Sequence, residues 1–153
     1  KKSELKGLVL DLRNNPGGDL FAAVDIAGLF LPKGSKILTI ETNSNTTDYT
    51  AKGRLWKGRQ LAIWQNSFTA SASEILIAGL VDNDMALSFG SKSYGKAMTQ
   101  TVLELSDHSA LIISRGRLAS PRGNSWQNKG LDPMFHIKDS AVSWGEITQM
   151  YLK

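Results

Sequence analysis

A short apolar run near the start of the chain, Gly-Leu-Val-Leu-Asp-Leu at residues 7–12, restricts the fold more than any other segment. It stops at an Asn-Asn-Pro-Gly-Gly turn, and a run of this length bounded by turn residues predicts a buried β-strand entering a tight loop. Asp19 follows the turn and can cap a helix, which we expect to continue to about Leu31, before Pro32 and Gly34. The chain therefore opens with a strand, a glycine turn and a helix.

Strand and helix signals continue to alternate along the rest of the chain. Apolar patterns predict strands at 36–42, 60–64, 86–89, 99–105 and 110–115, and a short strand after Asp132-Pro133. Helices are expected at 71–80 and 140–152, and loops at 42–49, 90–95 and 120–124. Because strands and helices alternate, this order predicts an α/β or mixed α+β fold. No linker or internal repeat divides the chain.

The composition indicates one folded domain. Of the 153 residues, 41% are hydrophobic, which is enough for a core and too many for a disordered chain. Cysteine is absent, and this excludes disulfide scaffolds, thiolate zinc sites and a cysteine nucleophile. The net charge of +4 comes from basic residues scattered along the chain, so we expect no nucleic-acid partner.

We expect residues 1–153 to be a single domain cut from a longer protein, because a core strand begins almost at the first residue. No stretch approaches the roughly 20 apolar residues of a membrane span, and the first residues lack the order of a signal peptide. We therefore expect no integral membrane segment in this chain. We also expect no metal and no cofactor, because neither ligand spacing nor a phosphate-binding glycine pattern is present.

Ser71 begins a predicted helix and has two interpretations. Ser-x-x-Glu before an apolar run is typical of a capping box, in which Ser71 and Glu74 satisfy two helix amides. A serine at a helix entry also stands at the positive end of the helix dipole, with the amide of Ala72 available to bind an oxyanion. The turn at Gly17 and Gly18 can supply a second amide for the oxyanion. The two interpretations of Ser71 are compatible, because a serine in capping geometry can still present its hydroxyl oxygen.

A nucleophilic serine needs a base, and the chain has only two histidines. His108 lies in a predicted hairpin turn, and His136 in a late strand is most simply an ordinary, partly buried residue. A lysine can replace histidine where burial favours its neutral form. Lys96 is the candidate because it follows a strand in a small-residue loop, although a solvated surface lysine is its simpler interpretation when taken alone.

Four motifs follow one another along the chain. They are Leu-Asp-Leu-Arg-Asn-Asn-Pro-Gly-Gly at 10–18, Ala-Ser-Ala-Ser-Glu-Ile at 70–75, Tyr-Gly-Lys-x-x-x-Gln at 94–100 and Gln-x-Lys-Gly-Leu-Asp-Pro at 127–133. In this order they closely resemble the C-terminal processing, or tail-specific, peptidases over nearly the whole chain. Lys96 follows Ser71 by 25 positions and Gln100 follows Lys96 by 4, as the family pattern expects.

The resemblance implies a role for each of these residues. Ser71 would be the nucleophile of a Ser-Lys dyad, Lys96 its general base and Gln100 the residue that orients the lysine, while the backbone amides of Gly17 and Ala72 would form the oxyanion hole. It also implies a crotonase-like or ClpP-like core, with a twisted sheet flanked by helices. The implied activity is that of a serine endopeptidase, which cleaves polypeptides near an apolar C-terminal tail through an acyl-enzyme.

The resemblance further implies a PDZ domain or helical regions that precede this core in the full-length parent, and a periplasmic or cell-envelope setting. Two departures from the family pattern, Phe68 before the serine motif and Ala97-Met98 after the lysine, affect the expected substrate preference. The main alternative is a non-catalytic module that binds a ligand or protein on the same scaffold. A third is an interaction domain in which Ser71 is only a cap and Lys96 points to solvent.

Overall fold

The structure, a computed structural model, describes residues 7–53, 55–56, 58, 61–137 and 144–151. Its elements follow the order β1 (Val9–Asp11), α1 (Leu20–Gly28), β2 (Lys36–Glu41), β3 (Thr46–Thr50), β4 (Leu61–Gln65), α2 (Ala72–Val81), β5 (Ala86–Gly90), β6 (Met98–Glu104), β7 (Ala110–Ala119), β8 (Phe135–His136) and α3 (Trp144–Tyr151). This alternation confirms the mixed α/β class that the sequence predicts.

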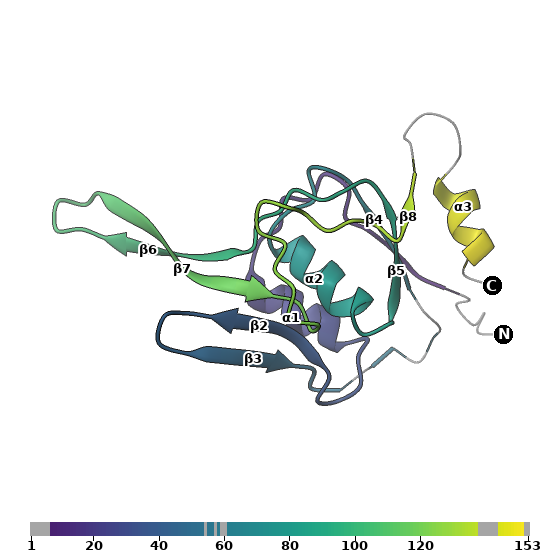
Figure 1. Cartoon of the computed structure of the whole chain (residues 1–153), viewed down its shortest axis with the longest axis horizontal. Coiled ribbons are helices and arrows are strands. Elements are labelled where there is room, and N and C mark those ends of the chain that lie inside the picture. Colours follow the sequence, from purple (N-terminus) through teal and green to yellow (C-terminus); the bar gives the residue numbers. More distant parts are fainter. Residues whose placement is uncertain (1–6, 54, 57, 59–60, 138–143, 152–153) are drawn as a thin grey trace.

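The strands within the described ranges form two four-stranded sheets. The first has the order β1-β4-β5-β8 with parallel pairing throughout, and the second has the order β3-β2-β7-β6 with antiparallel pairing. Helix α2 lies between β2 of the second sheet and β5 of the first, and α1 packs beside it (Figure 1). One hydrophobic core therefore joins both sheets around α2.

The two central helices form for different local reasons. All residues of α2 from Ala72 to Leu80 are buried, as expected for a helix that is enclosed on every side. Helix α1 buries one small-residue face, and the Asp19 side chain accepts a hydrogen bond from the amide of Ala22 at 2.7 Å. The helix cap that the sequence predicts at Asp19 is thus confirmed.

Parallel pairing decides where a site can form. Strands β1, β4 and β5 lie side by side and run in the same direction, so their carboxyl ends point to the same end of the first sheet. The loops that follow these strands, at 12–19, 66–71 and 91–97, meet at that carboxyl-terminal end. In open α/β sheets, ligands usually bind beside the carboxyl ends of the strands.

One predicted loop is wrong. The polar segment 42–49 contains most of β3, which pairs with β2 through a turn at 42–45. Side chains along β3 alternate between exposed and half-buried, because successive side chains of a strand point to opposite faces of the sheet. Most side chains of β3 are Thr or Asp, and Asp48 accepts a hydrogen bond from Thr39 across the hairpin at 2.6 Å. The strand therefore lacks the apolar alternation by which strands are recognised.

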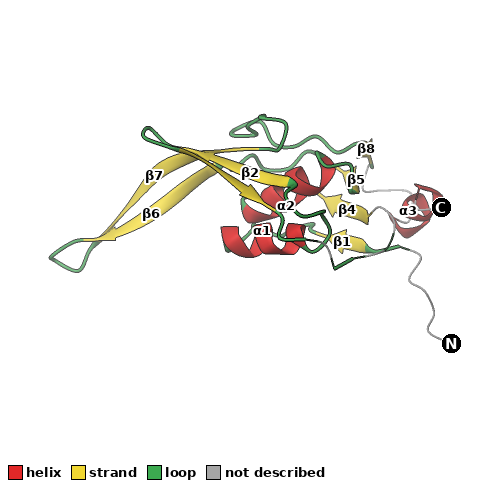
Figure 2. Cartoon of the chain, turned by 90° about the horizontal axis from the view of Figure 1, so that it is seen from below, coloured by secondary structure: helices red, strands yellow, loops and turns green. Residues whose placement is uncertain are grey.

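The β6–β7 hairpin extends away from the rest of the molecule (Figure 2), and it confirms the predicted pair of strands at 99–105 and 110–115. Strand β6 has the predicted length, whereas β7 is longer than predicted because it continues to Ala119 and joins β2 through its second half. Large apolar side chains are exposed along the hairpin: Val102, Leu103, Leu105, Leu111, Ile112 and Ile113. The hairpin thus combines a core-facing base with a projecting arm.

Helix α3 closes a second, smaller cluster beside the first sheet. The rings of Phe89 and Phe135 stack at a centroid distance of 5.0 Å, and Tyr151 contacts both. The predicted helix 140–152 is therefore present over 144–151, whereas 138–143 lie outside the described residues. Within the part of the chain that the structure describes, no helix is long and apolar enough to cross a membrane.

Candidate active site

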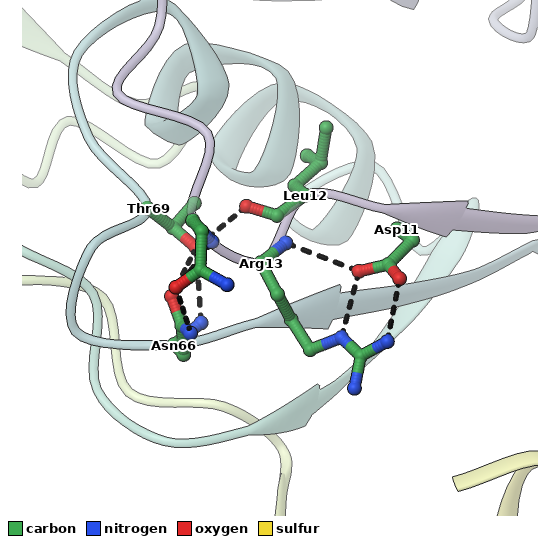
Figure 3. A network of polar contacts seen from close by, with 6 residues as sticks. Asp11, Leu12, Arg13, Asn66 and Thr69 are labelled. Atoms are coloured by element: carbon green, nitrogen blue, oxygen red, sulfur yellow. Dashed lines mark hydrogen bonds and ion pairs between the residues drawn. The ribbon is translucent and has the colours of Figure 1, made fainter.

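Polar contacts fasten the loop after β1 to the loop after β4. The side chains of Asn14 and Asn66 are joined by a hydrogen bond of 2.9 Å, and the amide of Asn14 donates to Asn66 Oδ1 at 3.0 Å. Thr69 Oγ1 donates to the carbonyl oxygen of Leu12 at 2.8 Å (Figure 3). These bonds hold the Gly-Gly turn and the segment before Ser71 against each other.

Ser71 itself has a strained backbone. Its φ of 57° and ψ of −120° suit glycine better than a residue with a side chain, and they differ from the extended conformation of an ordinary N-cap. The residue stands at the sharp turn between the β4 loop and α2, the geometry by which a nucleophile elbow presents its hydroxyl. Ala72 is the first residue of α2, so its amide has no acceptor within the helix.

Gly17 lies directly against this turn. A methyl group added at Gly17 would lie 2.6 Å from the carbonyl oxygen of Ala70 and 2.7 Å from the amide nitrogen of Ala72, and the φ of Gly17 is 96°. Only glycine fits there. The two predicted oxyanion residues, Gly17 and Ala72, are therefore neighbours, although the amide of Gly17 donates to Asn15 Oδ1 at 2.9 Å in this structure.

The loop after β5 reaches the same place and carries Lys96. The amide of Tyr94 donates to the carbonyl oxygen of Thr69 at 2.9 Å, and Lys96 is half-buried. Gln100 lies on β6, where it is exposed. Among the described residues, no hydrogen bond joins the side chains of Ser71, Lys96 and Gln100 to one another. The fold thus brings the Ser71 and Lys96 segments together, without a hydrogen bond between the Ser71 and Lys96 side chains.

Glu74 links the two segments, although the sequence pattern predicts only a capping role for it. Its carboxylate is fully buried and accepts hydrogen bonds from the amides of Ser71 and Lys96 at 2.8 Å each. It also accepts bonds from Ser93 Oγ at 2.6 Å and from the amide of Gly95 at 2.7 Å. The available signal was a single carboxylate within an otherwise apolar or small-residue helix.

Two aromatic side chains are exposed beside the site. Phe68 and Tyr94 are 68% and 67% exposed, and both belong to the loops that carry Ser71 and Lys96. Phe68 is the bulky residue that departs from the family pattern. Its exposure means that it is available to contact a substrate rather than to pack in the core.

The other candidate groups lie elsewhere or have structural partners. His108 is in the turn of the β6–β7 hairpin, and His136 is exposed on β8 rather than partly buried as predicted. Arg13 pairs with Asp11 at 2.6 Å, and its guanidinium lies 4.8 Å from the ring centre of Trp64. Among the described residues, no group of three His, Asp or Glu side chains can hold a metal ion.

Comparison with known proteins decides the family. The model of Peptidase family S41 matches residues 1–137. The chain belongs to Peptidase family S41. A curated relative, the "Carboxyl-terminal-processing protease" of Synechocystis sp., is 37% identical over 142 residues, which are 93% of this chain and 33% of that protein. A "Probable CtpA-like serine protease" of Staphylococcus aureus is 36% identical over 135 residues, covering 86% of this chain and 27% of the relative.

The fold agrees with this assignment. A solved "photosystem II D1 C-terminal processing protease" superposes with a TM-score of 0.84 and 32% sequence identity, covering 93% of this chain and 37% of the other. The family resemblance noted from the four motifs is therefore confirmed. The chain spans about a third of the length of the relatives that it matches.

Proposed function

We propose that this S41 domain is the catalytic core of a serine endopeptidase in which Ser71 is the nucleophile and Lys96 the general base. The observation that carries the proposal is the position of Ser71, in a strained turn at the start of α2, between the Gly17 turn and the Lys96 loop. The relatives named as carboxyl-terminal-processing and serine proteases support the reaction class.

The reaction begins with the side-chain nitrogen of Lys96 in its neutral form. This nitrogen takes the proton of the Ser71 hydroxyl as Oγ attacks the carbonyl carbon of the scissile peptide. The resulting oxyanion is bound by the amide of Ala72 and, once Gly17 releases Asn15 Oδ1, by the amide of Gly17. Gln100 orients the lysine in the substrate-bound state, in which catalytic hydrogen bonds tighten relative to the empty site.

Collapse of the tetrahedral intermediate breaks the C–N bond. Lys96 gives its proton to the leaving amine, and the acyl group remains on Ser71 as an ester. Water then attacks this ester while Lys96 accepts one of the water protons. Cleavage of the ester bond returns that proton to Ser71 Oγ and releases the new carboxyl terminus.

The proposed substrate is a polypeptide that is cut near an apolar C-terminal tail. The exposed rings of Phe68 and Tyr94 beside the site offer an apolar surface to such a tail. The printed names of two relatives also refer to processing of a carboxyl terminus. In the full-length parent, a preceding PDZ domain or helical region would deliver the tail to this site.

The decisive experiment uses the full-length parent and an unstructured protein with an apolar C-terminal tail. Cleavage by the unchanged protein is compared with cleavage by the Ser71→Ala and Lys96→Ala variants. We expect kcat/KM of both variants to fall by at least about 10³-fold. Ser67→Ala and Lys92→Ala are matched controls, because Ser67 and Lys92 are exposed neighbours of the same residue types. Equal cleavage by all variants would reject the dyad. Tail binding without any cleavage would instead favour the non-catalytic binding module.

We also propose that the longer protein works outside the cytoplasm, in the periplasm or cell envelope. The family resemblance supports this setting, and both curated relatives come from bacteria. Fractionation of cells that express the tagged full-length parent tests it. Recovery of the protein in the cytoplasmic fraction alone would contradict the proposal.

A further inference from the structure

The buried carboxylate of Glu74 has more partners than a helix cap requires. A capping box requires only one bond of the Glu74 side chain, the one that Oε2 accepts from the amide of Ser71 at 2.8 Å. The same Oε2 accepts the amide of Lys96 at 2.8 Å, while Oε1 accepts Ser93 Oγ and the amide of Gly95. Three of the four bonds therefore go to the loop after β5, not to α2.

These bonds are selective for a carboxylate. An ionised carboxylate accepts hydrogen bonds on both oxygens, whereas an amide side chain replaces one acceptor by an NH₂ group. If that NH₂ group took the place of Oε1 it would face the amide of Gly95, and in place of Oε2 it would face the amides of Ser71 and Lys96. Either orientation sets buried donors against one another, which is costly where water is excluded.

The carboxylate also acts on the strain at Ser71. A positive φ at a residue with a side chain persists only where its surroundings enforce it. Glu74 Oε2 holds the amide of Ser71 and, through the same atom, the amide of Lys96. The backbones of the two proposed reacting residues are thus fixed relative to one shared oxygen atom.

We infer that Glu74 is a positioning residue, whose buried carboxylate sets the separation of Ser71 and Lys96 and maintains the strained turn at the nucleophile. The inference rests on the proposed Ser71–Lys96 function. The hydrogen bonds of the Glu74 carboxylate go to backbone amides and to Ser93 Oγ, not to Ser71 Oγ or to the side-chain nitrogen of Lys96. Glu74 acts on the chemical step through the two backbone amides that it binds. We therefore expect replacement of Glu74 to lower kcat rather than to raise KM.

The test compares Glu74→Gln with the unchanged full-length parent. Because small displacements of reacting groups cost about 10²-fold in rate, we expect kcat to fall by about that factor while KM changes less than about threefold. The pH dependence of kcat/KM should also shift, because the surroundings of the base change. A merely structural role would leave the profile of the remaining folded enzyme unchanged.

Gln65→Leu is the matched control. Gln65 is buried and donates hydrogen bonds to the carbonyl oxygens of Ser91 and Leu131, so it fastens the same loop without touching Ser71 or Lys96. We expect this variant to lose stability while keeping its kcat within about threefold. Ser93→Ala removes only one donor to Glu74, and we expect a fall in kcat of about fivefold. It keeps the test available should Glu74→Gln fail to fold.

Hydrogen exchange separates the possible outcomes without relying on activity. Glu74→Gln should lose protection at the amides of Ser71, Gly95 and Lys96, whereas Gln65→Leu should retain it. Normal kcat in Glu74→Gln, with Ser71-dependent cleavage intact, would overturn the positioning role and leave the proposed function standing. If the parent shows no Ser71-dependent cleavage, both proposals fail, and lost protection would then show that Glu74 has a structural role alone.

Discussion

The serine at position 71 occupies a backbone conformation that suits glycine, and glycine at position 17 occupies the space beside it. The two features depend on each other, because any side chain at Gly17 would collide with the backbone on either side of Ser71. Two strand-to-helix turns in the sequence predict that these residues meet. The strain at Ser71 could not be predicted in the same way, since its φ is set by contacts between segments distant in sequence.

Replacement of Ser71 should separate stability from activity. Ser71→Gly relieves the strain at a φ of 57°, and we expect it to be more stable than Ser71→Ala by about 1 kcal/mol. Both variants lack the hydroxyl and should be inactive in the full-length parent. Urea unfolding of the two variants measures the difference. Equal stability would mean that the turn stores no strain.

Gly17 and Gly18 provide a contrast within one turn. Gly17→Ala places its methyl group 2.6 Å from a carbonyl oxygen, so we expect a loss of about 1–3 kcal/mol in stability together with lost cleavage. Nothing lies within 4 Å of a methyl group at Gly18, and Gly18→Ala should change stability by less than about 0.5 kcal/mol. Thermal unfolding compares the two variants. Similar losses would contradict the close packing at Gly17.

Asp11 should give the fold a pH dependence. Hydrogen bonds from Arg13 hold the pKa of the Asp11 carboxyl below its ordinary value of 3.8. A depressed folded-state pKa stabilises the fold above pH 3.8, and this stabilisation disappears as the pH falls through the folded-state pKa. At about pH 7, Asp11→Asn should therefore cost less than about 1 kcal/mol, because the pair is partly exposed.

Urea unfolding of the unchanged chain and Asp11→Asn, at neutral pH and again in acid, measures this effect. The difference between the two proteins should narrow as the Asp11 carboxylate is protonated. A difference that stays constant at acid pH would assign the effect to packing against Arg13 rather than to charge.

At the scale of elements, local signals predicted most strands and helices, because capping residues and apolar runs act over a few positions. Helices α1 and α2 and the β6–β7 hairpin follow from such signals. Strand β3 was missed because most of its own side chains are polar, and Glu74 was missed as a link because its partners in the loop after β5 lie 19 to 22 positions away. Local periodicity carries no information about such distant partners.

The cap of α1 can be tested as an element. Asp19→Ala removes the bond from the amide of Ala22, and we expect it to cost about 1 kcal/mol. Asp25→Ala is the matched control on the same helix, since the Asp25–Lys52 ion pair is largely exposed. Urea unfolding should show the smaller loss for Asp25→Ala. A loss at Asp25 as large as at Asp19 would assign the effect to charge rather than to capping.

At the scale of the whole molecule, the two sheets share a core around α2, while the β6–β7 hairpin projects from it (Figure 1). Stability should differ accordingly, because segments with few buried contacts open more readily. We expect hydrogen exchange at 102–112 in the hairpin to be at least about 10²-fold faster than in β4 and α2 of the same chain. Equal protection would indicate that another surface covers the hairpin in solution.

The loops at the site hold their backbones in place by hydrogen bonds while leaving two aromatic side chains exposed. This arrangement affects how the sequence of such a domain can vary. The amides of Phe68 and Tyr94 are fastened to Asn66 Oδ1 and to the carbonyl oxygen of Thr69, yet their rings face outward. Substitutions that replace these aromatic side chains leave the backbone hydrogen bonds of the two loops in place. Under the proposed function, new cleavage preferences can therefore arise at these two positions, in evolution or in a laboratory library, while the surrounding backbone is inherited unchanged.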